Sequence, residues 1–347
     1  MKSNNRKNLH LILAAVLFLF AISIPSSGQN ALVSKMKVVY PQDPAITDCR
    51  VTSVAAFDKY VAWGTNLGVL IESKNGFAKW HTPKNAPFKV NEFVSIAFYG
   101  PEIWVGCRSF DGGGLFKYDG KEWTYFDPAK YSMLQGLVSC LLADRMNRLW
   151  IAYLEFGLNR YVGWSYGRQM SEVFTSIKAK HGLLSGTVYS MADGGRYLWV
   201  GTNQGLAKMD TFASHSDVFS HKHYTISNGF PGQAVFSLTP YKDSVAAGTD
   251  LGFVVPDGEN WKVFKKKDGL ISVPVKCMAS EGDRVWIGTN RGLQCFENGK
   301  LLPDVIDSSN GLPSDGIHCI AAMTDSNGSS KVFIGTDKGA RTLIFTR

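Results

Sequence analysis

Short apolar segments alternate with polar turns along the whole chain after residue 28. Runs of Val, Ile, Tyr, Phe and Trp are broken by Gly, Asn and Asp, and no apolar stripe at a 3.6-residue spacing reaches a useful length. One segment recurs, most clearly as LWVGTNQGL at 198–206. The pattern predicts an all-β protein made of repeated units.

The repeat occurs seven times, with a Gly or Ala at one anchor position in every copy. The anchors are separated by 40 to 49 residues. They are Gly64, Gly106, Ala152, Gly201, Gly248, Gly288 and Gly335. A period in the forties made of strand-like pieces is typical of the four-stranded blade of a β-propeller.

A second recurring register precedes most anchors by some ten residues. In all seven units it reads apolar, variable, Ser or Cys, apolar, as in VYSM at 188–191. We interpret it as the strand that lines the central channel, and the segment around the anchor as the next strand outward. A glycine-containing turn such as TNQG then leads into the third strand.

The two ends of the chain together predict ring closure. The last unit stops after its third strand, whereas KVVY at 37–40 precedes the first unit and belongs to none. This segment is expected to complete the last blade, so that no edge strand stays unpaired. The fold expected is a single seven-bladed β-propeller over residues 29–347.

The first 28 residues have the features of a secretory signal peptide. Basic residues Lys2, Arg6 and Lys7 precede an apolar run at 9–24, and small residues follow at 26–28. The apolar run is shorter than the roughly 20 residues of a spanning helix. The sequence therefore predicts an exported protein, periplasmic or extracellular, without stable membrane insertion after cleavage.

Composition agrees with a large folded domain and limits the partners. The chain is 45% hydrophobic and 12% aromatic, and its formal net charge of +8 includes three basic residues of the first 28. Lys and Arg are otherwise scattered, and the cluster Lys265–Lys267 is interpreted as a solvated strand end. No nucleic-acid partner is expected.

The repeat resembles a known family. The run G-L-x-x-x-x-V, seen as GLLSGTV at 182–188, then L-W-[IV]-G-T-[ND]-x-G-L, is similar to the two-component regulator propeller repeat. That repeat occurs in stand-alone exported propellers and in the sensor regions of bacterial hybrid histidine kinases. The resemblance implies the sensing part without the kinase, so that signalling would need a partner chain.

Candidate ligand-binding residues occupy the variable slot of the innermost strand. Four adjacent units carry Tyr189, Phe236, Lys276 and His318 there, whereas the other three carry Thr52, Val94 and Ser139. Two aromatic rings, a cation and an imidazole near the channel mouth suit an anionic or sugar-like ligand. The alternative is that these side chains only fill the gap between blades.

Two units depart from the repeat and supply candidates for a polar rim. Unit two has Arg108 and Asp111, and unit three has Tyr153 and Glu155, where the others have the GTN turn. Drift in a tolerant loop is the alternative. An insert at 162–170, which contains Trp164, is expected to cover part of this rim.

The recurring Trp and Cys residues are interpreted as structural. A Trp precedes the anchor in five units, at Trp199 for example, and is expected to pack blade against blade rather than to stack on sugar. Cys140, Cys277 and Cys319 take the slot of Ser in other units and are expected to be small core residues. A disulfide among Cys49, Cys107 and Cys295 is left open.

Catalytic chemistry has little support in the sequence. His221 and His223 lie on one side of an expected strand, but no carboxylate or Cys completes a metal site with them, and no cofactor motif is present. We therefore expect a non-enzymatic binding module whose partner is a small ligand, such as an oligosaccharide, or another cell-envelope protein. The alternative is a propeller lyase or hydrolase with His318 and a metal at the channel mouth.

Overall fold

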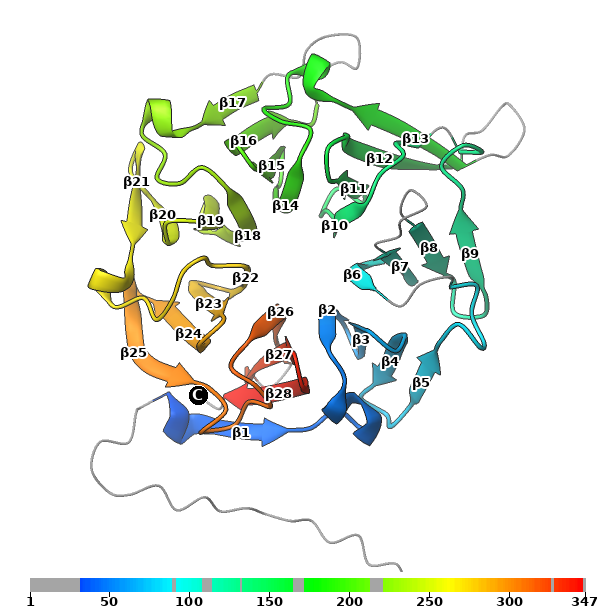
Figure 1. Cartoon of the computed structure of the whole chain (residues 1–347), viewed down its shortest axis with the longest axis horizontal. Helices are drawn as coiled ribbons and strands as arrows, with labels where there is room; N and C mark the ends of the chain where they lie inside the picture. The colour runs from blue at the N-terminus through cyan, green and yellow to red at the C-terminus, as the bar shows by residue number, and fades with distance from the viewer. Residues whose placement is uncertain are drawn as a thin grey trace, which may run out of the picture.

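Seven antiparallel sheets, each of four strands, surround a central channel (Figure 1). The computed structural model describes residues 32–88, 92–107, 114–131, 133–164, 172–212, 221–325 and 328–345. In six sheets the strand nearest the channel comes first in sequence and the next strands follow outward, whereas the outermost strand of the seventh is β1 (Met36–Val39). The predicted seven-bladed propeller is thereby confirmed, and blades 1 to 7 are numbered in chain order.

The first four blades contain sixteen consecutive strands. They are β2 (Val51–Phe57), β3 (Tyr60–Thr65), β4 (Val69–Ser73) and β5 (Ala78–His81) in blade 1; β6 (Phe93–Tyr99), β7 (Glu102–Cys107), β8 (Gly114–Tyr118) and β9 (Trp123–Phe126) in blade 2; β10 (Val138–Ala143), β11 (Leu149–Tyr153), β12 (Gly157–Trp164) and β13 (Glu172–Ile177) in blade 3; and β14 (Val188–Gly194), β15 (Tyr197–Thr202), β16 (Gly205–Asp210) and β17 (His221–Tyr224) in blade 4.

The last three blades follow the same plan. They contain β18 (Val235–Tyr241), β19 (Ser244–Thr249), β20 (Phe253–Asp257) and β21 (Asn260–Phe264) in blade 5; β22 (Cys277–Glu281), β23 (Arg284–Thr289), β24 (Gly292–Glu297) and β25 (Lys300–Ile306) in blade 6; and β26 (Ile317–Thr324), β27 (Ser330–Thr336), β28 (Gly339–Phe345) and β1 (Met36–Val39) in blade 7. Short 3₁₀ turns are η1 (Val33–Lys35), η2 (Pro44–Asp48), η3 (Ala179–His181), η4 (Ile226–Asn228) and η5 (Lys266–Asp268).

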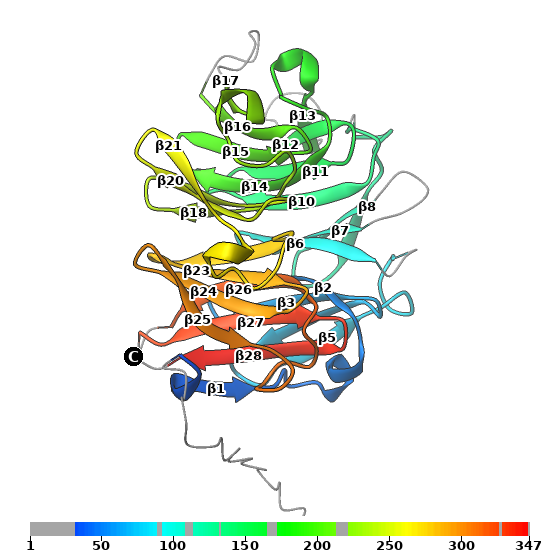
Figure 2. The same cartoon turned by 60° about the vertical axis from the view of Figure 1, so that its left-hand side comes forward.

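Ring closure occurs where the sequence predicts it. β1 pairs antiparallel with β28, in a register that runs from Met36 opposite Phe345 to Val39 opposite Thr342. Both views show β1 beside β28 on the outer side of blade 7 (Figures 1 and 2). The last blade therefore takes its fourth strand from the other end of the chain, and this pairing covers the edge of β28.

The core consists of hydrophobic clusters between neighbouring blades. Trp63, Trp104, Trp150 and Trp286 are at most 1% exposed, and Trp199 is 3% exposed. These side chains project from the second strand of their blades, so the predicted packing role is confirmed.

The anchor glycines lie where successive blades approach most closely. A Cβ atom built on Gly201 would lie 2.4 Å from Ser190 Oγ and 2.8 Å from both Cγ1 and the carbonyl oxygen of Val235 in the next blade. Ser190 Oγ itself donates a hydrogen bond to that carbonyl at 3.3 Å. The Ser or Cys of the repeat thus links neighbouring innermost strands, a role beyond the small packed residue that the sequence suggests.

This link recurs around the ring. The other Ser or Cys side chains that donate to a carbonyl of the next blade are Ser53 to Phe93, Ser237 to Val275, Cys277 to Ile317 and Cys319 to Val51. The last of these joins blade 7 to blade 1.

Residues 1–28, the predicted signal peptide, lie outside the described residues. In the part of the chain that the structure describes, no helix has the length and apolar character needed to cross a bilayer.

Candidate functional site

A β-bulge presents the variable-slot residue to the channel. In six blades the pairing of the two inner strands skips the variable residue, as between Val188 and Ser190 on β14. In blade 6 the corresponding residue, Lys276, directly precedes β22. A bulge leaves one residue unpaired and re-aims its side chain. The variable-slot residue therefore does not follow the strict alternation of side chains along a regular strand.

The seven variable-slot residues line one cavity on the axis of the ring. This cavity has a volume of about 190 Å³, and its walls include the Ser or Cys slot as well. The variable-slot members are Thr52, Val94, Ser139, Tyr189, Phe236, Lys276 and His318. The structure thus brings together the four ligand-binding residues proposed from the sequence.

Two of these residues form an aromatic pair across neighbouring blades. The ring centroids of Tyr189 and Phe236 are 5.4 Å apart, and the ring planes are inclined by 36°. Both side chains are partly exposed. They offer a continuous aromatic surface at one side of the channel, against which a flat or ring-shaped ligand can stack.

A hydrogen-bonded pair lies in blade 7. His318 Nε2 is 2.6 Å from Oδ1 of Asp337, which lies in the turn between β27 and β28. The Asp337 side chain is 51% exposed, so one carboxylate oxygen stays available to solvent or to a ligand. The sequence did not single out Asp337, because other units also have Asn or Asp at this position of the repeat and Asp337 therefore looks like part of the common pattern.

Lys276 is the cation of the cavity. It is exposed and follows the Val273–Pro274 peptide, which is cis. No described carboxylate lies within ion-pair distance of its ammonium group. A solvated cation without a fixed partner beside an aromatic pair can bind an anionic group of a ligand.

The polar rim is only partly supported. Glu155 is exposed in the turn between β11 and β12, with a φ of 78°. Tyr153 is only 2% exposed and belongs to the core between blades 2 and 3, so its assignment to the rim is wrong. Its large apolar ring packs inward at the end of β11. Arg108 and Asp111 lie outside the described residues, as does most of the insert at 162–170.

The six cysteines are all free thiols. Burial raises the pKa of Cys49 to about 11 and the pKa values of Cys107 and Cys295 to about 12. These three residues belong to separate hydrophobic clusters, and no disulfide joins them. Thiols held in the neutral form are poor nucleophiles and poor metal ligands.

A metal site has no complete ligand set in the described residues. No group of three His, Cys, Asp or Glu side chains is placed to hold an ion within the ranges that the structure describes. His223 Nε2 lies 3.0 Å from the carbonyl oxygen of Gly182, which is a structural contact.

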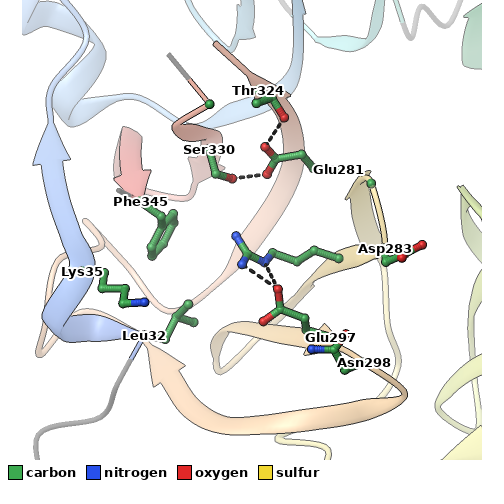
Figure 3. A pocket seen from close by; sticks show the side chains of 12 residues that line it. Leu32, Lys35, Glu281, Asp283, Glu297, Asn298, Thr324, Ser330 and Phe345 are labelled. Atoms are coloured by element: carbon green, nitrogen blue, oxygen red, sulfur yellow. Dashed lines mark hydrogen bonds and ion pairs between the residues drawn. The ribbon is translucent and has the colours of Figure 1, made fainter. Parts of the chain in front are cut away.

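A charged cavity of about 480 Å³ lies between blades 6 and 7, beside the closing strand (Figure 3). Glu281 accepts hydrogen bonds from the hydroxyls of Thr324 and Ser330, and Glu297 accepts two from the Arg284 guanidinium, the shorter at 2.7 Å. The view shows Lys35 on the opposite wall. Both carboxylates already accept hydrogen bonds from neighbouring side chains. We therefore interpret this cavity as part of the structure that closes the ring, and not as a ligand-binding site.

Solved structures share the propeller fold. No protein-family model and no curated protein sequence matches the chain. Virginiamycin B lyase from Staphylococcus aureus, in a catalytically inactive form with quinupristin, has a TM-score of 0.63 at 10% identity over 90% of this chain and 99% of that chain. YCF48 bound to a D1 peptide has a TM-score of 0.61 at 16% identity over 94% and 100%, respectively.

Extracellular domains of two-component systems are also among the solved structures to which the chain is similar. The extracellular domain of a putative hybrid two-component system from B. thetaiotaomicron has 14% identity and a TM-score of 0.46 over 85% of this chain. The present chain spans about half of that chain, 51% of its length. At these identities the comparisons show the fold alone.

Proposed function

We propose that this chain is an exported, non-enzymatic binding module whose channel mouth recognises a small ligand with a sugar-like ring and an anionic group. One observation carries the proposal: Tyr189, Phe236, Lys276 and His318 come from adjacent blades and line one cavity, and Asp337 lies within hydrogen-bond distance of His318. Export rests on the signal-peptide pattern of residues 1–28.

Each part of the cavity has a defined role in this proposal. The Tyr189–Phe236 surface stacks against the apolar face of the ring, and Lys276 binds the anionic group. The free oxygen of Asp337 accepts hydrogen bonds from hydroxyl groups. The blades on the other side of the channel contribute small side chains such as Thr52, which is already engaged by donating to the carbonyl oxygens of Phe93 and Gly64.

The experiment is a thermal-shift screen of residues 29–347 against neutral and acidic oligosaccharides and small anionic metabolites. A ligand at 100 times its dissociation constant adds about 2.7 kcal/mol of stability. For a hit, Lys276→Ala and Tyr189→Ala are expected to weaken binding at least tenfold. Val94→Ala, in the same slot across the channel, is the matched control and should leave the affinity unchanged.

Two results would contradict this proposal. A hit whose affinity is the same in Lys276→Ala, Tyr189→Ala and the parent protein would place binding outside the channel. A folded sample without any hit would favour recognition of a cell-envelope protein, as the peptide-bound YCF48 propeller illustrates for the fold. Such a site would use the outer turns, among them Glu155, and pull-down with a Glu155→Lys variant would test it.

The lyase or hydrolase alternative rests on the His318–Asp337 pair, because an imidazole hydrogen-bonded to a carboxylate can serve as a general base. No group of three His, Cys, Asp or Glu side chains is placed to hold a metal within the described residues, so this pair is one ligand short of a usual catalytic set. Turnover that disappears in a folded His318→Ala variant, or on addition of a chelator, would establish this alternative.

A further inference from the structure

A third cavity, of about 740 Å³, lies between blades 1 and 2. It is formed by the hairpins that join the first to the second and the third to the fourth strands, at 57–60, 73–77, 98–103 and 118–120. The turns around the channel mouth join the second to the third strands, so they lie at the other end of the antiparallel strands. This cavity therefore opens on the opposite face of the propeller.

Aromatic and aliphatic side chains make up most of its wall. Phe57 and Phe77 are 54% and 50% exposed. The rings of Phe57 and Phe98 stack with centroids 5.9 Å apart and planes inclined by 29°. Ile71 and Ile103 also line the cavity. Two exposed phenylalanines of blade 1 and the partly buried Phe98 of blade 2 form an apolar surface that has no cover in the described part of the chain.

His81 belongs to this wall, and one of its two ring nitrogens has no hydrogen-bond partner among the described residues. Trp123 Nε1, which can only donate, donates a hydrogen bond of 2.9 Å to His81 Nδ1. In the neutral imidazole the proton therefore resides on Nε2. The residue is 3% exposed, and its Nε2 finds no acceptor among the described residues. A buried donor without an acceptor lowers the stability of the folded protein, because the donor has lost its hydrogen bonds to water. A ligand that supplies an acceptor regains this free energy on binding.

The charges around the cavity restrict the ligand further. Asp58 and Asp119 line it, and no Lys or Arg is among its lining residues. Burial lowers the pKa of His81 to about 4, so the imidazole stays uncharged at neutral pH. Two carboxylates without a cation disfavour an anionic ligand, and a ligand without an acceptor leaves the His81 donor unpaired.

We propose that this cavity is a second ligand-binding site, separate from the channel, that takes an uncharged molecule with a flat apolar ring and a carbonyl or ether oxygen. The ring stacks against Phe57 and Phe98, and the oxygen accepts a hydrogen bond from Nε2 of His81. The site works independently of the ligand proposed for the channel, so the two proposals fail separately.

Benzophenone is the probe for this site, because it is uncharged and carries two rings and a carbonyl group. Its affinity is measured by thermal shift and compared with those of diphenylmethane, which lacks the acceptor, and of 4-benzoylbenzoate, which is anionic. We expect binding of benzophenone to be about fivefold to tenfold tighter than that of diphenylmethane. 4-Benzoylbenzoate should bind more weakly than benzophenone.

Photolysis of the bound probe localises it. The excited carbonyl takes a hydrogen atom from a nearby C–H bond, and the two carbon radicals combine to form a covalent bond. Peptide mapping is expected to find the label on segments that contain Phe57, Phe77 or Phe98. Label on the channel strands or spread evenly over the surface, or equal binding of diphenylmethane, would overturn the proposal.

Two variants separate binding from folding. Phe57→Ala truncates an exposed ring and should lower both labelling and affinity several-fold, whereas Phe212→Ala, which truncates a 61% exposed ring in blade 4, is the matched control. His81→Phe should abolish the preference for benzophenone over diphenylmethane. If His81 had a purely structural role, His81→Phe would leave the preference for benzophenone unchanged, and that result would refute the site. Labelling and affinity that stay the same in Phe57→Ala would also refute it.

Discussion

Replacing Gly201 by Ala tests how closely successive blades pack. Gly201 does not adopt a left-handed conformation, so its own φ and ψ angles accept an alanine without strain. The added methyl would instead lie 2.4 Å from Ser190 Oγ and 2.8 Å from two atoms of Val235. Distances below 3.0 Å require movement, and two of the three atoms belong to the neighbouring blade.

The cost follows from these contacts. Overpacking of a well-packed site costs about 1 to 3 kcal/mol. Ser190 Oγ can move away only by giving up its hydrogen bond to the carbonyl of Val235, which adds about 1 kcal/mol. Gly201→Ala is therefore expected to destabilise the protein by about 2 to 4 kcal/mol.

Urea unfolding followed by tryptophan fluorescence measures this effect. With a slope of about 3 kcal/mol per molar urea, the midpoint should fall by about 1 M. Blade 3 provides the matched control, because it has Ala152 at the same position of the repeat. Ala152→Gly should cost only about 0.5 to 1 kcal/mol, the usual cost of glycine in a strand.

A double variant checks the mechanism. Because Gly201→Ala already sacrifices the Ser190 hydrogen bond, adding Ser190→Ala should cost little more, and the two changes should be clearly non-additive. A midpoint for Gly201→Ala within about 0.3 M of the parent would refute the argument that blade contact requires glycine here.

Three further predictions concern closure, core and pH. Deletion of residues 36–40 removes β1 and exposes the edge of β28, so the melting temperature should fall; an unchanged value would contradict closure by this strand. Trp199→Ala should cost about 3 to 5 kcal/mol in urea unfolding, and a loss below about 1 kcal/mol would place Trp199 outside the core. The unfolded chain protonates His81 near its ordinary pKa of 6.5, but the folded chain does so only near about 4, so stability should fall by up to about 3 kcal/mol as the pH drops through this window. The variant His81→Phe should lose this part of the pH dependence, and an unchanged slope would refute the assignment.

Much of the fold could be predicted because every blade repeats the same four-stranded pattern and the same contacts with its neighbours. The anchor spacing predicted the number of blades, and the Ser or Cys register predicted the order of the strands. The segment at 37–40, which belongs to no unit, predicted closure of the ring, and the structure confirms all three predictions. The recurring Trp positions predicted the core for the same reason. Periodicity is informative where identical contacts recur around a ring.

The candidate sites depend on contacts that no periodicity encodes. The bulge that turns the variable slot toward the channel is a backbone irregularity without a residue signature in this repeat. The partner of His318 is Asp337, which looks like any other member of the repeat frame. Tyr153 was assigned to the rim because its loop departs from the repeat, yet its ring is buried between blades.

The sequence by itself determined the architecture of this protein: the strand pattern, the number of blades and the pairing of the two ends of the chain. Only the tertiary structure decided which side chains share a cavity. Tyr189 and Phe236 meet because their blades are neighbours. Trp123 of the next blade donates to Nδ1 of His81 and so leaves the imidazole proton on Nε2, which has no acceptor among the described residues. Strand pairing follows local alternation along the chain, whereas a binding site depends on atoms brought together by packing between blades.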